Sequence, residues 1–150
     1  MSTTVRTSLH GKKLGLSPEN NLVSEGIQIS QPCVNATITV GDEAANVRAI
    51  TIQLSDSKGN DIDYAETVEI IMYLDAAKVA FVATGGSTGI EIGTDGALLD
   101  VVAKKYFLAT SETDGDIDLT WTDTGTEVAF LGVRLPNGRI VMSTTLANAA

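Results

Sequence analysis

The stretch Ile117–Met142 limits the fold most strongly, because its side chains alternate in the manner of β-strands. Its first third reads Ile, Leu and Trp separated by Asp and Thr. Successive side chains of a strand leave opposite faces of a sheet, so this alternation predicts a half-buried strand. Asn137 and Gly138 then predict a tight hairpin. We expect three consecutive strands here, as a meander central to one β-domain, with the nearly all-apolar Glu127–Leu135 covered on both faces.

The same alternation recurs through the preceding part of the chain. It predicts strands over residues 34–40, 47–54, 67–74, 90–92, 97–103 and 106–110, with Leu74 among the inward side chains. Residues 75–83 are ambiguous, and their Val and Phe favour a strand. No stretch has a sustained helical period. About nine short strands separated by turn residues predict an all-β, antiparallel β-sandwich, either jelly-roll or immunoglobulin-like.

Residues 1–30 differ from this pattern and are predicted to form an extended N-terminal arm. They are rich in glycine, and only Val5–Leu9 and Leu22–Ile29 have short strand-like patterns. Pro32 marks the boundary, since proline suits a strand start. Two alternatives stay open for the arm: it packs along its own body, or it orders on a partner. We expect a sandwich body over residues 31–146 and a frayed tail over residues 147–150.

Charge is divided unequally between the arm and the rest of the chain. Residues 1–30 have three basic and two acidic side chains, a net charge of +1, and residues 31–150 have seven basic and seventeen acidic ones, a net charge of -10. An acidic body repels phosphates, so we expect no nucleic acid and no membrane as partners. The opening residues do not resemble a secretory signal.

Few residues suggest chemistry. Cys33 is the single cysteine, expected as buried packing. The acidic turn at 114–118 offers oxygen ligands but lacks EF-hand spacing, so a solvated turn is favoured over calcium. The glycine-rich residues 85–89 are expected to be a loop tip, because the lysine of a phosphate-binding loop is missing. Glu127 and Arg134 flank an apolar strand, and we expect them either to form an ion pair with each other or to lie at a protein interface. We expect no catalytic residue, metal or cofactor.

Two long segments, residues 38–62 and 89–143, resemble a family of small proteins encoded by tailed bacteriophages and prophages. The resemblance covers most of residues 33–145, and its marks are three turns: IGTDG at Ile92–Gly96, SETDGDIDL at Ser111–Leu119 and LPNG at Leu135–Gly138. It implies a virion structural protein, made in the host cytoplasm and located on the capsid surface.

The resemblance favours one role, a capsid decoration (cement) protein that binds the outside of the major capsid protein shell. The partners would be the major capsid protein and further copies of the chain, as a dimer or trimer. The arm residues expected to bind are Arg6, Leu9, His10, Lys12, Lys13, Leu14 and Leu16. The alternatives are a tail or neck component and an immunoglobulin-like module that binds host-surface glycans. A glycan site needs an exposed aromatic platform, and Trp121 is expected in the core instead.

Overall fold

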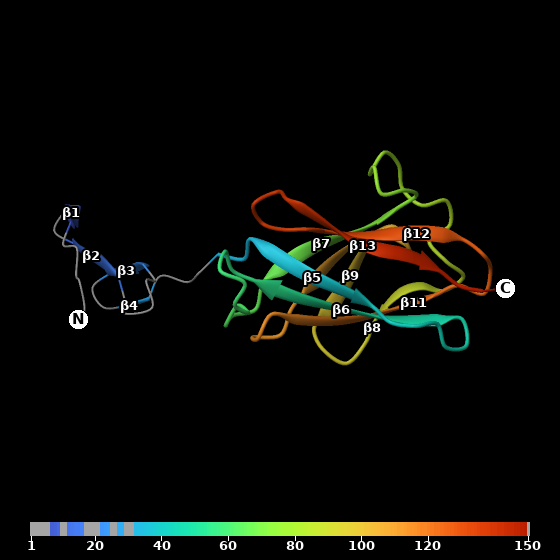
Figure 1. Ribbon diagram of the computed structural model, residues 1–150, viewed down its shortest axis with the longest axis horizontal. Helices are drawn as coiled ribbons and strands as arrows, with labels where there is room; N and C mark the ends of the chain where they lie inside the picture. Colours follow the sequence, from blue (N-terminus) through green and yellow to red (C-terminus); the bar gives the residue numbers. More distant parts are fainter. Residues whose placement is uncertain (1–6, 10–11, 17–21, 25–26, 29–31, 150) are drawn as a thin grey trace. The chain divides into compact units, whose positions relative to one another are not determined.

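The chain forms two compact units in the computed structural model, Met1–Pro32 and Cys33–Ala150 (Figure 1). The structure describes residues 7–9, 12–16, 22–24, 27–28 and 32–149. The sequence placed the boundary two residues earlier. Pro32 itself is exposed, and Cys33 is buried as expected, with 2% of its surface accessible.

The first unit is a small antiparallel sheet of four short strands. They are β1 (Thr7–Leu9), β2 (Lys12–Leu16), β3 (Leu22–Ser24) and β4 (Ile27–Gln28), in the order β1-β2-β3-β4. Each strand pairs with the next along the chain. In the described residues of this unit, strand pairing therefore joins only strands that are consecutive in the chain.

The second unit is a β-sandwich of nine strands, and every strand pair in it is antiparallel. One sheet has the order β13-β12-β7-β10-β9 and the other the order β5-β6-β11-β8 (Figure 1). The strands are β5 (Asn35–Val40), β6 (Val47–Ser55), β7 (Thr67–Tyr73), β8 (Gly89–Ile92), β9 (Ala97–Val102), β10 (Tyr106–Thr110), β11 (Asp116–Thr122), β12 (Val128–Arg134) and β13 (Ile140–Ala147). The expected all-β, antiparallel sandwich is confirmed. The described residues form no helix that could cross a membrane.

The core lies between the two sheets and is mainly aliphatic. Alternate residues of β6, β7 and β11 point into it and are almost completely buried, as their period of two predicted: Ile50, Ile52, Leu54, Val68, Ile70, Met72, Ile117, Leu119 and Trp121. Trp121 is 0% exposed. A sugar ring therefore has no access to the indole, and the preference for a core tryptophan is confirmed.

Ile117–Met142 is not one meander, and this expectation was wrong. β12 and β13 do pair around the expected hairpin, where Gly138 has a φ of 85°. However, β11 pairs with β6 and β8 in the other sheet, so residues 123–127 cross from one sheet to the other. Alternation in a sequence identifies a strand and its buried side, whereas its hydrogen-bonding partners depend on the rest of the chain.

Residues 75–83 do not form the favoured strand. They follow β7 as bends and turns, with a single bridge between Tyr73 and Phe81. Leu74 and Val79 are 49% and 80% exposed, so Leu74 is not an inward residue. Lys78 has a φ of 63°, a left-handed conformation that interrupts a strand.

The C-terminal residues are anchored rather than frayed through residue 149. Strand β13 continues to Ala147, and Asn148 is 6% exposed. The Asn148 side-chain amide donates hydrogen bonds to the carbonyl oxygens of Asn46 at 2.6 Å and Asp123 at 2.9 Å. Polar composition suggested fraying here, but these long-range contacts hold the end of the chain.

Candidate interaction surface

The two outer faces of the sandwich differ in chemistry. On the four-stranded sheet, the outward residues opposite one another are threonine, glutamine and acidic residues, as in the rows Thr39–Thr51–Asp118 and Thr37–Gln53–Asp116. A hydrogen bond of 3.1 Å joins the Thr51 hydroxyl to the Asp118 carboxylate. We call this surface the polar face. Asp116 and Asp118 point outward on β11, as expected of a solvated strand.

The outer face of the five-stranded sheet is mostly apolar. Residues directly opposite in antiparallel strands lie on the same face of a sheet, so the strand register defines its rows. One row, from β9 to β13, is Leu99–Leu108–Glu69–Arg134–Ile140, and the next is Val102–Tyr106–Ile71–Gly132–Met142. Phe130 follows on the same side of β12. We call this surface the apolar face.

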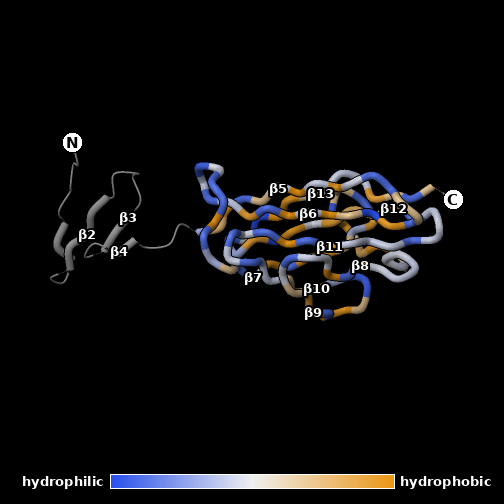
Figure 2. The backbone as a smooth tube through the Cα atoms, turned by 90° about the horizontal axis from the view of Figure 1, so that it is seen from below, coloured by the Kyte–Doolittle hydropathy of each residue, from blue (hydrophilic) through white to orange (hydrophobic). Residues whose placement is uncertain are grey.

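Part of the apolar face is open to solvent. Leu99 is 63% exposed and Val102 45%, both on β9, which ends the sheet. Figure 2 shows β9 as a hydrophobic stretch at the rim of the body. The other apolar side chains of the face, among them Ile71 and Leu108, are half-buried. A monomer gains nothing from an exposed apolar sheet face, and such surfaces typically mark contacts with other proteins.

The apolar face was missed from the sequence. Glu127–Leu135 was expected to be covered on both faces, yet Val128 is 47% exposed and Phe130 is half-buried. The signal that could have found it is the poor alternation of β9 and β12, which read ALLDVV and VAFLGVR. Apolar residues on both sides of a strand indicate either a doubly buried strand or an exposed contact surface.

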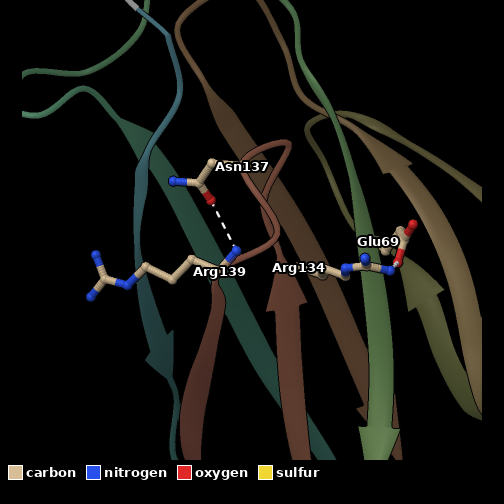
Figure 3. A network of polar contacts seen from close by, with 4 residues as sticks. All are labelled: Glu69, Arg134, Asn137 and Arg139. Atoms are coloured by element: carbon tan, nitrogen blue, oxygen red, sulfur yellow. Dashed lines mark hydrogen bonds and ion pairs between the residues drawn. The ribbon is translucent and has the colours of Figure 1, made fainter.

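An ion pair between Glu69 and Arg134 lies within the apolar face. The Arg134 Nη1 is 3.1 Å from the Glu69 Oε2, and the two side chains are 31% (Glu69) and 50% (Arg134) exposed (Figure 3). The two residues are register partners on β7 and β12. They border a hollow of about 310 Å³ whose other walls include Leu108, Leu135, Pro136 and Gly138. The Arg139 side chain points away from this pair (Figure 3).

Glu127 does not pair with Arg134, so that possibility was wrong. Its carboxylate instead accepts hydrogen bonds from the backbone N–H groups of Thr84, Gly85 and Gly86 at 2.8–2.9 Å, and from the Thr84 hydroxyl at 2.6 Å. Burial alone would raise the pKa of Glu127, but these four donors lower it overall. The glycine-rich loop therefore binds a carboxylate of its own chain through three backbone N–H groups and one hydroxyl.

The loop that follows Thr84 is also fixed from the opposite side. The buried Trp121 Nε1 donates a hydrogen bond to the Gly85 carbonyl oxygen at 3.1 Å, and the Lys104 Nζ donates to the Gly86 carbonyl oxygen at 3.3 Å. The Asp123 carboxylate accepts from the Ser87 backbone N–H at 3.1 Å. The expected loop tip is thus an anchored loop. Its three glycines 85, 86 and 89 all have positive φ.

The acidic turn near Asp116 has a distinct electrostatic environment. Burial, and then the neighbouring charge of Asp118, raise the pKa of Asp116, with smaller contributions from Asp95 and Asp114. One carboxylate oxygen of Asp116 is buried without a hydrogen-bond partner. In the part of the chain that the structure describes, no three His, Cys, Asp or Glu residues form a group that could hold a metal ion.

The arm residues named from the sequence fall in the first unit. Leu9 lies in β1, and Lys12, Lys13, Leu14 and Leu16 lie in β2, where Leu9 is the register partner of Lys12. Arg6 and His10 lie outside the described residues.

No protein-family model matches the chain, and no curated protein matches it. Among solved structures, the chain is similar to a cohesin module from a family 33 glycoside hydrolase of Clostridium perfringens. The two share 17% identity, with a TM-score of 0.43, over 78% of this chain and 97% of that module.

Proposed function

We propose that this chain is a non-enzymatic assembly protein of a tailed-phage virion, namely a capsid decoration protein on the outside of the major capsid protein shell. The observation that carries the proposal is the apolar face. A sandwich whose core is already complete exposes a second apolar sheet surface, with Leu99 63% exposed and Val102 45%. Burying such a surface against protein contributes about 25 cal/mol per Å² of apolar area.

The contrast between the two faces supports an assembly role. The polar face, with its threonines and aspartates, suits water, whereas the apolar face suits a protein surface. A protein fixed to a particle needs one side for contacts and one for solvent. Many copies, each adding a modest contact energy, stabilise a shell by mass action.

The first unit is the proposed shell-binding part, as the family resemblance implies. Its strands β1 and β2 contain Leu9, Lys12, Lys13, Leu14 and Leu16, and Arg6 and His10 belong to the same stretch of sequence. Residues 1–30 have a net charge of +1, against -10 for the rest of the chain. Against an acidic shell surface, this charge difference would favour contact through the first unit.

The test is binding to purified capsids from the encoding phage or prophage that lack this protein. The full chain should decorate the heads, and a chain without residues 1–20 should not, although its body still folds. Burial of Trp121, followed by its fluorescence, checks the fold of the truncated chain. Normal decoration by the truncated chain would contradict the binding role of the first unit.

Electron cryo-microscopy of the particle then locates the bound copies. Density on the head surface would support a decoration protein. Density at the neck or tail would instead support the alternative of a tail or neck component. Absence from the particle would reject the virion assignment as a whole.

A further inference from the structure

We infer that the apolar face is a self-association surface, on which a second copy of this chain packs its own apolar face about a two-fold axis. The inference rests on the proposed assembly function and names the partner for the same surface. Sheets commonly pack face to face through apolar side chains, about 10 Å apart. Two identical partners related by a two-fold axis present the same patch to each other, so the patch must be self-complementary.

Charge is the first evidence for a second copy. Residues 31–150 have a net charge of -10, so two bodies repel each other across most of their surfaces. The two rows of the apolar face contain one acidic and one basic residue, Glu69 and Arg134, and are locally neutral. A strongly acidic or basic partner would find no excess of opposite charge there. The partner that fits is apolar with one anion and one cation, and the apolar face itself has this composition.

The order of residues across the sheet is the second evidence. The middle of the first row reads Leu108–Glu69–Arg134–Ile140, from β10 through β7 and β12 to β13. A two-fold axis along the strands, between β7 and β12, places Glu69 of each copy over Arg134 of the other. The same rotation places Leu108 over Ile140. Acid meets base and apolar meets apolar in both directions across these four strands, and β9, with Leu99 and Val102, extends past β13 of the other copy.

The second row has the same symmetry. It reads Tyr106–Ile71–Gly132–Met142 across the same four strands, and the ring of Tyr73, from the same side of β7, packs over Gly132. The rotation places Tyr106 over Met142, and a thioether beside an aromatic ring is a favourable contact. Asp100, the acidic residue of β9, is the register partner of the inward-pointing Phe107 and so does not belong to the face.

The test measures the mass of the full chain in solution across a range of concentrations, by light scattering or sedimentation. The expected mass is twice the 15.7 kDa of one chain. Arg134→Glu and Glu69→Arg should each weaken association by at least about a hundredfold, since each places like charges opposite one another. Because both side chains are partly exposed, both variants should still fold, which a thermal melt followed by Trp121 fluorescence checks.

Mixing the two variants is the decisive step. Neither can re-form its own ion pair, yet a mixed dimer sets two acids against two bases, so association should return only in the mixture. Thr39→Glu, on the exposed polar face, is the matched control and should leave the mass unchanged.

Three results would overturn the inference. The first is a wild-type mass of one chain at every concentration, which is expected if something other than a second copy covers the face. The second is a dimer that neither charge variant weakens. The third is failure of the mixed variants to associate. These results are separable from the proposed function. A monomer that decorates capsids removes the inference alone, and a dimer that never binds capsids removes the proposed function alone.

Discussion

The indole Nε1 of Trp121 donates a hydrogen bond to the carbonyl oxygen of Gly85 at 3.1 Å, and this contact joins the glycine-rich loop to the core. Trp121 is the single tryptophan of the chain and is 0% exposed. Its fluorescence therefore reports both global unfolding and release of the loop. The contacts that hold this loop, including those of the Glu127 carboxylate with residues 84–86, lead to specific predictions about stability.

Gly85→Ala should destabilise the fold by about 2–4 kcal/mol. Gly85 has a φ of 86°, and a Cβ there would collide with the carbonyl oxygen of Lys104, which is backbone and cannot move aside cheaply. Gly59→Ala is the matched control. It has a φ of 85° but nothing within 4 Å of its Cβ, so it should cost about 1 kcal/mol. Urea unfolding followed by Trp121 fluorescence measures both, and equal costs would contradict the collision.

Glu127→Gln should lower stability by about 1–2 kcal/mol at neutral pH. The two carboxylate oxygens together accept four hydrogen bonds, whereas the amide keeps one neutral acceptor oxygen and places an NH2 group, which cannot accept, at the other position. The pKa of Glu127 in the folded chain lies below its ordinary value of 4.5. Its contribution is therefore complete above pH 4.5 and is lost as the pH falls through the folded pKa.

The difference between wild type and Glu127→Gln should accordingly shrink in acid, as measured by unfolding free energies from neutral pH downward. Glu91→Gln, an exposed substitution on β8, serves as the control and should have little effect at any pH. A constant difference between wild type and Glu127→Gln from neutral to strongly acidic pH would show that charge is not the source of the effect.

The sequence predicted the strands well because each is a local pattern. The buried positions of β6, β7 and β11 follow directly from the period of two, and Gly138 identifies the β12–β13 hairpin. It did not predict which strands pair, so β11 was placed beside β12 although residues 123–127 cross between sheets. Between the two strands, the Asp123 carboxylate accepts hydrogen bonds from the backbone N–H groups of Ser87 and Glu127, and an alternating pattern does not reveal such contacts.

The interaction surface was harder to predict, because burial is a property of the assembled sheet. The outward positions of β9 and β12 are apolar, and a one-dimensional pattern cannot tell whether another element covers them. Leu99 and Val128 are exposed since no element of the described body packs over them. The ion pair of Glu69 and Arg134 joins residues 65 apart in sequence, which only the register of β7 and β12 brings together.

Asp116→Asn should raise stability by about 0.5 kcal/mol at neutral pH. Burial and the charge of Asp118 raise the pKa of Asp116 above its ordinary value of 3.8, so its ionised form is less favourable in the folded chain than in the unfolded one. This cost is present at pH values above the folded pKa and vanishes below pH 3.8, so the gain from the substitution should vanish there too. Thermal melts at neutral pH and in acid below that value measure the difference. Asp118→Asn weakens a hydrogen bond from Thr51 and should not give the same gain.

Arg48→Met should destabilise the chain by about 2–3 kcal/mol and release its C-terminal end. The Arg48 Nε donates hydrogen bonds to the Ala147 carbonyl oxygen at 2.9 Å and to the Asn148 Oδ1 at 3.1 Å, and Nη1 donates to the Gly41 carbonyl oxygen at 3.0 Å. One guanidinium thus connects β6 to the end of β13. Methionine preserves much of the packing of the side-chain stem and removes the donors.

Arg139→Met, at the exposed hairpin, is the control with the same change of charge. Amide hydrogen exchange over residues 140–149 should accelerate in Arg48→Met and remain unchanged in Arg139→Met, whereas equal exchange in both variants would mean that Arg48 does not hold the C-terminal strand.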